Sequence, residues 1–426
     1  MRLAWASRTP HDRGAMLSKA AATMRARADE LGRTTTLESG KPFAQGRGEW
    51  FAAADLFEWY AEEGKRAYGR VIPSRVKTKR MHVLKQPIGV VGLITAWNFP
   101  AYNMARAGAA ALAAGCTVVM RPSEYTPLTV MEMVNILVEA GLPAGVVNLV
   151  NGEPDPMGQE MLANPACAKI HFTGSVRVGK HLMDGASKTV TRLSLELGGN
   201  APVLVFPDVD LDQVAAGSVT AKFRNGGQVC VSPQRFLVHR AVRDAFVERV
   251  APRVRALRVG EGIDPSTDVG PLINAKQRDR VEALVAAAEA AGATIAAGGT
   301  RPAERAHGYY FQPTVVSNVT TTMPIYHEEI FGPVLPVATF DDLDEAVRLA
   351  NHTRYGLAAY VWTNDLRTAL RASERLEFGM IGVNEWTPHA TEAPFAGWKE
   401  SGLGREAGLE GLEEYLETKL VAFGGI

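Results

Sequence analysis

Cys230 is the side chain of this sequence best suited to covalent chemistry. It lies in Asn225-Gly226-Gly227-Gln228-Val229-Cys230-Val231-Ser232, where two glycines precede a lone thiol. Glycines permit a bent backbone that exposes a sulfur and nearby N–H groups to a substrate, and a thiolate is a strong nucleophile. We expect this segment at a loop-to-helix junction. An isolated cysteine is more often a small buried hydrophobic residue, so the nucleophile hypothesis depends on neighbouring groups.

Glu196 is the candidate base. The segment Leu195-Glu196-Leu197-Gly198-Gly199-Asn200 places its carboxylate at the end of an apolar strand, just before a glycine turn. Partial desolvation there would raise the affinity of the carboxylate for a proton, which suits a general base. The alternative is a solvated charge at the end of a strand.

Two further segments follow apolar strands. Ala96-Trp97-Asn98-Phe99-Pro100 offers the side-chain amide of Asn98 to a developing oxyanion, although a lone asparagine there is more often a turn residue. The sequence Phe-Thr-Gly-Ser-Val-Arg-Val-Gly at 172–179 follows a strand and opens a helix, which suits a dinucleotide pyrophosphate. Because the segment 172–179 lacks the GxGxxG pattern, it is weak evidence for a dinucleotide site when taken alone.

The composition narrows the class of protein. The 426 residues include 46 Lys and Arg against 46 Asp and Glu, so the formal net charge is zero and neither nucleic acid nor an anionic membrane is an expected partner. Three scattered cysteines form no disulfide scaffold, and no metal site is expected. No apolar run reaches the roughly 20 residues of a bilayer span, and no signal peptide is visible. We predict a cytoplasmic protein.

The candidate residues must be positioned by alternating strands and helices. Helical spacing covers 16–37 and 49–65, and the basic alternating stretch 66–86 predicts exposed or edge strands. Beyond residue 87, short β-branched runs alternate with amphipathic helices, and the series is repeated after residue 203. The first series of predicted strands covers 88–95, 117–120, 146–150, 169–172 and 189–195. Such βαβ series predict an α/β protein with parallel strands.

Together these motifs resemble the aldehyde dehydrogenase superfamily, most closely its succinic semialdehyde dehydrogenase-like members. The resemblance extends over nearly the whole chain. It rests on Ala-Trp-Asn-Phe-Pro (96–100), Arg-Pro-Ser-Glu (121–124), Phe-Thr-Gly-Ser (172–175), Leu-Glu-Leu-Gly-Gly-Asn (195–200), Gly-Gln-Val-Cys (227–230), Glu-Glu-Ile-Phe-Gly-Pro-Val (328–334) and Pro-Phe-Ala-Gly-Trp-Lys-Glu-Ser-Gly-Leu-Gly-Arg-Glu (394–406). Family members usually carry a further N-terminal segment, so a truncation or a misassigned start is expected here.

The resemblance implies an architecture of three parts. These are a doubly wound dinucleotide-binding domain (1–65 and 87–198), an α/β catalytic domain (199–408) and a small β oligomerisation element (66–86 and 409–426). The basic stretch and the end of the chain would pair with each other and extend a partner subunit's sheet. We therefore expect a homodimer or a homotetramer.

The resemblance also implies a mechanism. Cys230 would attack a small aldehyde, Asn98 and the Cys230 N–H would hold the oxyanion, and Glu196 would activate the water that hydrolyses the thioester. NAD is the expected cofactor, because the Glu124 carboxylate would repel a 2′-phosphate. NADP stays open, because Arg121 stands where the family usually has lysine. The implied cofactor-binding residues are Trp97, Arg121, Ser123, Glu124, Thr173, Gly174, Ser175, Glu329 and Phe331.

The implied substrate is a short anionic semialdehyde. Arg106 and Arg224 match the carboxylate-binding arginines of the semialdehyde dehydrogenases, and two guanidinium groups in an aldehyde tunnel would grip an anionic tail. His389 stands in place of a carboxylate-binding serine and would donate more strongly to an anion when protonated. Surface salt bridges are the alternative for the arginines. A lactaldehyde, glycolaldehyde or sulfolactaldehyde dehydrogenase and a cofactor-independent cysteine esterase remain alternative functions.

Overall fold

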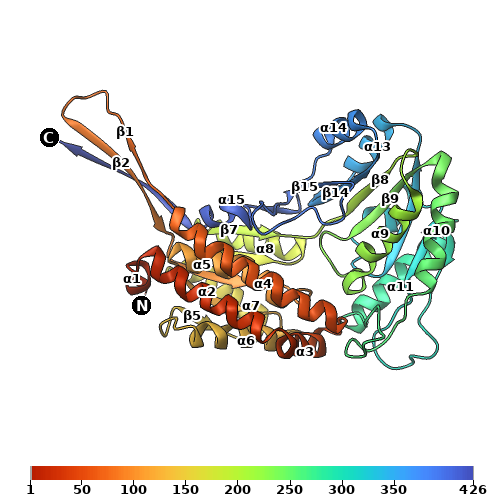
Figure 1. Ribbon diagram of the computed structural model, residues 1–426, viewed down its shortest axis with the longest axis horizontal. Helices are drawn as coiled ribbons and strands as arrows, with labels where there is room; N and C mark the ends of the chain where they lie inside the picture. Colours follow the sequence, from red (N-terminus) through yellow and green to blue (C-terminus); the bar gives the residue numbers. More distant parts are fainter. Residues whose placement is uncertain (1, 426) are drawn as a thin grey trace.

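The computed structural model describes residues 2–425, and Figure 1 shows two α/β halves with a long β arm projecting from one of them. The first half is built on a six-stranded sheet of order β17-β7-β6-β3-β4-β5. Its strands are β3 (Val90–Ile94), β4 (Thr117–Arg121), β5 (Val147–Leu149), β6 (Cys167–Thr173), β7 (Arg192–Glu196) and β17 (Gly402–Leu403). All neighbours pair in parallel except β17, which is antiparallel to β7.

Helices of the first half pack beside this sheet and against one another. The Ala-rich α5 begins with proline at its first turn and ends at Gly115, whose φ of 98° stops the helix, so both boundaries follow from the sequence. The helices are α1 (Arg2–Ala6), α2 (Pro10–Ala26), α3 (Ala28–Ser39), α4 (Phe43–Glu63), α5 (Pro100–Ala114), α6 (Pro127–Glu139), α7 (Pro154–Ala163), α8 (Val176–Ala186) and α15 (Gly408–Glu413), with the 3₁₀ turn η1 (Gly64–Arg66).

The second half is built on a seven-stranded sheet of order β10-β11-β12-β9-β8-β14-β15. Its strands are β8 (Ala201–Val205), β9 (Pro233–His239), β10 (Thr294–Ala297), β11 (Thr314–Ser317), β12 (Val334–Phe340), β14 (Ala358–Trp362) and β15 (Met380–Val383). Its helices and turns are α9 (Leu211–Phe223), η2 (Arg224–Gly227), η3 (Arg240–Val242), α10 (Arg243–Arg255), α11 (Ala275–Ala290), α12 (Pro324–His327), α13 (Leu343–Asn351) and α14 (Leu366–Arg375). The pair β13 (Tyr355–Gly356) and β16 (Trp398–Lys399) lies apart from both large sheets.

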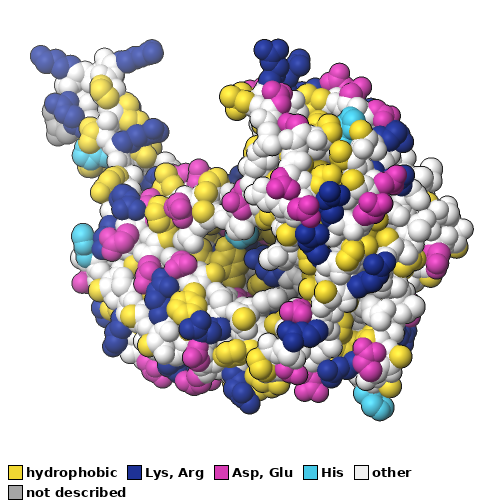
Figure 2. Space-filling model, turned by 45° about the vertical axis from the view of Figure 1, so that its right-hand side comes forward, with side chains coloured by type: hydrophobic (Ala, Val, Ile, Leu, Met, Phe, Trp, Pro, Cys, Tyr) yellow, Lys and Arg dark blue, Asp and Glu magenta, His cyan; other side chains and the backbone are white. Residues whose placement is uncertain are grey.

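The arm is a three-stranded antiparallel sheet of order β1-β2-β18, formed by β1 (Arg70–Ile72), β2 (Lys79–Pro87) and β18 (Leu416–Gly424). The predicted pairing of the basic stretch with the end of the chain is confirmed within one chain, and Ile426 lies outside the described residues. Lys and Arg side chains gather on the arm, and the face in Figure 2 is hollowed between the two halves.

The α/β class with parallel central strands and an aldehyde dehydrogenase-like arrangement is confirmed, and the boundaries of the three domains stay a prediction. Two local predictions were wrong. The single helix predicted over 16–37 is two helices, because Arg27 leaves the helical region with φ −101° and ψ 12°. The strand predicted from residue 189 begins at Arg192, because Val190 adopts a left-handed φ of 56° that no extended strand accepts.

None of the helices in residues 2–425 combines the length and the apolar character that crossing a bilayer requires.

Candidate active site

Glu196 is the last residue of β7, and its carboxylate is buried. Burial raises the pKa of Glu196, and the nearby Arg106 guanidinium opposes this shift. The predicted desolvation at this strand end is therefore confirmed. A carboxylate with raised proton affinity can take a proton from water, which is the requirement for a general base.

Cys230 follows η2 and precedes β9, so the predicted loop-to-helix junction was wrong. The bend comes from three consecutive left-handed residues, Asn225, Gly226 and Gly227, with φ of 49°, 61° and 72°. A Cβ on Gly227 would clash with the carbonyl oxygen of Gly332, so this position requires glycine. Burial raises the pKa of the Cys230 thiol, which is therefore neutral at rest and needs a base before it can attack.

Asn98 lies between β3 and α5 and faces the Cys230 loop. Its Nδ2 donates to the carbonyl oxygen of Gln228 at 3.1 Å, and its Oδ1 accepts from Asn103 Nδ2 at 3.1 Å. An amide nitrogen carries two N–H groups, and within residues 2–425 only Gln228 accepts from this one. A second N–H therefore remains for an oxyanion.

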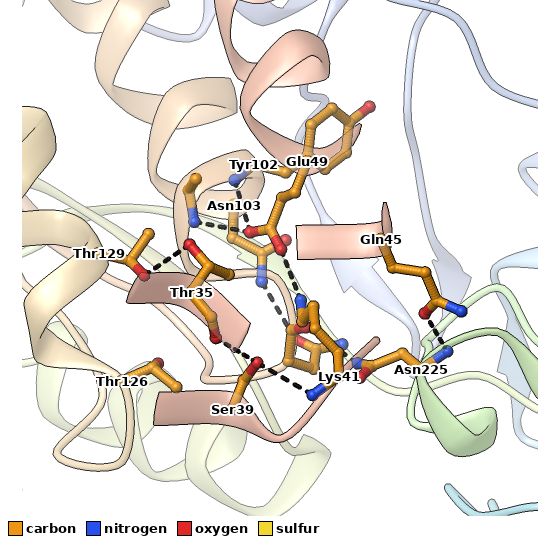
Figure 3. A network of polar contacts seen from close by, with 12 residues as sticks. Thr35, Ser39, Lys41, Gln45, Glu49, Tyr102, Asn103, Thr126, Thr129 and Asn225 are labelled. Atoms are coloured by element: carbon orange, nitrogen blue, oxygen red, sulfur yellow. Dashed lines mark hydrogen bonds and ion pairs between the residues drawn. The ribbon is translucent and has the colours of Figure 1, made fainter. Parts of the chain in front are cut away.

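A buried ion pair between Lys41 and Glu49, shown in Figure 3, holds the Asn98 loop; sequence patterns did not predict this pair. Lys41 Nζ lies 2.5 Å from Glu49 Oε2 and donates to the Asn98 carbonyl oxygen at 2.7 Å. Glu49 Oε1 accepts from the backbone N–H groups of Ala101 and Tyr102, at 2.7 and 3.2 Å, in the first turn of α5. The sequence itself shows only a Gly-Lys-Pro between α3 and α4, which is typical of a helix end.

Replacing Lys41 by methionine is expected to lower the free energy of unfolding by about 3–5 kcal/mol, because Glu49 would remain buried with an uncompensated charge. Urea denaturation monitored by circular dichroism measures the loss. Lys180→Met is the matched control, because its ion pair with Glu400 at 2.8 Å is largely exposed and should contribute less than about 1 kcal/mol. Equal losses in the two variants would contradict the structural role of Lys41.

The two halves enclose a cavity of about 400 Å³ in front of Cys230. Arg224 and His389 border it together with the thiol, and Arg106 forms part of its wall. Arg224 has no carboxylate partner within residues 2–425, and its guanidinium lies 5.2 Å from the centre of the Phe99 ring. Burial, reinforced by Arg224 and Arg106, lowers the pKa of His389 to about 4. The histidine is therefore neutral at pH 7 and can donate to an anion through one ring N–H.

Arg106 differs from Arg224 because its charge is already paired. Its NH2 lies 3.1 Å from Glu406 Oε2 and 4.0 Å from Glu196 Oε2, and all three side chains are buried. Glu406 Oε1 lies 2.8 Å from His171 Nε2. Sequence reasoning did not find Glu406 and His171 as site residues, because their link to Glu196 passes through Arg106.

A second cavity, of about 460 Å³, lies on the other side of Cys230. Glu329 borders it and accepts from the Gly199 backbone N–H at 2.9 Å, and burial raises its pKa to about 7. Glu196 and Cys230 border this cavity too. The predicted cofactor-binding residues that line it are Trp97, Thr173, Gly174, Ser175, Glu329 and Phe331.

The second cavity suits a dinucleotide. Ser175 caps the N-terminus of α8, and Thr173 Oγ1 is buried without a hydrogen-bond partner among the described residues. Arg121, Ser123 and Glu124 are not part of this cavity's lining; they lie at and beyond the C-terminal end of β4, where Arg121 NH2 pairs with Glu124 Oε2 at 2.9 Å.

The sequence model described as "Aldehyde dehydrogenase family" matches residues 2–421. This chain belongs to the aldehyde dehydrogenase family. It is 45% identical over 423 residues to a "Probable succinate-semialdehyde dehydrogenase [NADP(+)]" of Sinorhizobium fredii, covering 99% of this chain and 86% of that protein. Membership of the aldehyde dehydrogenase family makes the protein an oxidoreductase that acts on a small aldehyde.

Two further members of the aldehyde dehydrogenase family are similar to it. A "3-sulfolactaldehyde dehydrogenase" of Pseudomonas putida is 43% identical over 422 residues, with 99% of this chain and 86% of that protein covered. The crystal structure of succinate-semialdehyde dehydrogenase from Burkholderia pseudomallei superposes with a TM-score of 0.97 at 43% identity, covering 100% of this chain and 88% of that one. The fold predicted from the motifs is thereby confirmed.

Proposed function

We propose that the protein oxidises a short anionic semialdehyde, similar to succinic semialdehyde, to the carboxylic acid through a thioester on Cys230. The observation that carries this proposal is Arg224, a cation in the cavity of the nucleophile with no carboxylate to neutralise it within residues 2–425. A carboxylate or sulfonate at the far end of the substrate would supply the missing partner. The names of the similar proteins support this class of substrate.

The chemistry begins with the neutral Cys230 thiol. As its sulfur bonds to the aldehyde carbon, Glu196 takes the thiol proton, and the free Asn98 N–H and the Cys230 backbone N–H donate to the oxyanion. A bound NAD or NADP supplies the acceptor for the hydride that leaves this carbon. The thioester remains, and once its proton has left the site, Glu196 takes a proton from water as the water attacks. The carbon–sulfur bond breaks, and the thiolate regains a proton.

The side chains of the second cavity would hold the dinucleotide. We propose Glu329 for the nicotinamide ribose, Phe331 beside the ring, and Thr173, Gly174, Ser175 and the backbone of Trp97 for the nicotinamide and pyrophosphate. Arg121, Ser123 and Glu124 would hold the adenosine ribose. Because Arg121 is already paired with Glu124, a 2′-phosphate would have to displace that carboxylate, which favours NAD.

A panel of aldehydes tests the proposed function. Succinic semialdehyde, lactaldehyde, sulfolactaldehyde and butanal, each with NAD and with NADP, are followed by absorbance of the reduced nucleotide. A preference for the anionic aldehydes is expected. The P. putida relative and the pair Arg224 and His389 make sulfolactaldehyde the second candidate, since a sulfonate accepts from several donors. Ester hydrolysis without nucleotide as the main activity would favour the esterase alternative and contradict the proposal.

Arg224→Ala is expected to raise the KM for succinic semialdehyde by roughly 10- to 100-fold, because a charge-assisted hydrogen bond contributes about 1.5–3 kcal/mol. The KM for butanal, which has no anionic end, should change little. Initial rates with both aldehydes at a saturating nucleotide concentration measure the difference. Equal changes for the two aldehydes would contradict an anion site at Arg224.

We also propose that the arm joins copies of this chain into a homodimer or homotetramer. β1 and β18 are its outer strands, and Val71, Leu420 and Phe423 on them are exposed in the single chain. Sedimentation of the purified protein tests this, and a monomer at micromolar concentration would contradict it.

A further inference from the structure

A line of buried polar groups runs from the catalytic base to the strand that forms the arm. It starts at Glu196 and passes through Arg106, Glu406 and His171 to Tyr415, the residue before β18. Each of the five side chains is at most 5% exposed. Apart from Glu196, the proposed reaction gives none of these groups a task.

Close contacts join the groups of this line from Tyr415 toward the base. Tyr415 Oη lies 3.2 Å from His171 Nδ1, so its hydroxyl can donate to this nitrogen when His171 carries its proton on Nε2. The Nε2 atom lies 2.8 Å from Glu406 Oε1. Glu406 Oε2 in turn lies 3.1 Å from Arg106 NH2. Against the effect of burial, Arg106 and His171 together lower the pKa of Glu406 and so favour its ionised form.

The Arg106 guanidinium lies near two carboxylates. Glu406 is the nearer partner, and Glu196 lies 4.0 Å away on the same NH2. Other titratable groups that face this cluster are Tyr60 and Tyr102 around Arg106 and Glu406, Cys230 and Glu329 beside Glu196, and Lys169 over the Tyr415 ring. Within the described residues, Arg106 is the cation closest to Glu196. Whatever neutralises Arg106 therefore decides how readily Glu196 takes a proton.

We propose that His171 is a positioning residue for this reaction: it holds Glu406 against Arg106, so that Glu406 neutralises a charge that would otherwise act on Glu196. This rests on the proposed role of Glu196. Arg106 accordingly serves the base, and Arg224 is left as the guanidinium that receives the substrate anion. Without His171, Glu406 would lose the contact at 2.8 Å that favours its ionised form, and the carboxylate would retain a proton more readily. Arg106 would then act on Glu196 alone.

The test compares His171→Phe, Glu406→Gln and His171→Gln. Phenylalanine keeps a ring but removes the donor, and glutamine at 406 keeps the shape but removes the charge. In both variants the acid limb of the pH profile of steady-state oxidation is expected to move to lower pH, by about one unit for Glu406→Gln. His171→Gln retains an N–H donor and is expected to restore a profile close to that of the unaltered protein.

A second readout needs no nucleotide and no substrate turnover. Because Arg106 favours the thiolate of Cys230, its release should also move the pH dependence of Cys230 alkylation by iodoacetamide to lower pH. Peptide mass spectrometry separates Cys230 from Cys116 and Cys167. If the panel of aldehydes showed no oxidation, the proposed function would fail, and this readout would still test the network.

Lys169→Met is the matched control. Lys169 lies on β6 two residues before His171, and its buried Nζ pairs with Glu414 Oε2 at 2.8 Å, away from the base. It should destabilise the protein without moving either pH profile. Unmoved profiles in both His171→Phe and Glu406→Gln would overturn the proposal, as would an equal shift in Lys169→Met.

Discussion

Cys230→Ala should lower kcat/KM for aldehyde oxidation by roughly 10⁴-fold or more, because no other group of the site can form the thioester. Dinucleotide binding should be retained, since Cys230 is one residue among many that border the second cavity. Reduced-nucleotide absorbance measures the first effect, and a fluorescence titration of the dinucleotide measures the second.

The other two cysteines provide the controls. Cys116 is buried in the core beside the end of α5, and Cys167 is the partly buried first residue of β6. Alanine at either position should leave oxidation within a few-fold of the original rate. Turnover that survives Cys230→Ala would show that the nucleophile is another group.

Glu196→Gln is expected to separate the two halves of the reaction. Acylation should slow, because the Cys230 thiol must lose its proton to solvent instead of to Glu196, but it should still give a burst of reduced nucleotide close to the concentration of sites. The steady-state rate should fall by roughly 10²- to 10⁴-fold, because the water that hydrolyses the thioester is no longer activated. Stopped-flow absorbance resolves both phases. Glu374→Gln is the control, because it removes the same charge at an exposed position of α14.

The pH dependence gives the same assignment a second test. Burial raises the pKa of Glu196, so the ionised base is lost, as pH falls, at a pH above the ordinary range of a glutamate. The steady-state rate of the unaltered protein should therefore fall on the acid side of this elevated value. Glu196→Gln should lack that limb. An unchanged rate and an unchanged limb in this variant would exclude Glu196 as the base.

Sequence patterns predicted the parts of the site that depend on local order along the chain. Glu196 and Thr173 end neighbouring strands of one parallel sheet, and Asn98 follows a third strand, so the motifs that follow these strands lie at one edge. The short β-branched runs located these strands, and the glycines marked the bent Cys230 segment. The error at that segment arose because a glycine-rich bend precedes a strand as readily as a helix.

Such patterns could not predict contacts between residues that lie far apart in the sequence. Lys41 and Glu49 matter because of what they hold at Asn98, and Arg106 reaches Glu406 from an otherwise uninformative Ala-rich helix. Periodicity tells which face of a helix is buried, and a buried arginine there fits an anion site or an ion pair equally well. The choice between an anion site and an ion pair depends on how residues near the C-terminus pack. Helix α15 packs against α5, and Glu406 and Tyr415 contact His171 on β6.

The order in which the chain is synthesised adds a constraint on when this protein can become active. Gly402 pairs with Glu196, Tyr415 reaches His171 across 244 positions, and β18 pairs with β2 from the opposite end of the sequence. Contacts of such long separation form late, because the intervening chain must first be closed. A nascent chain can therefore arrange its strands and its thiol early, whereas the surroundings of the base form only after residues 402–415 have left the ribosome.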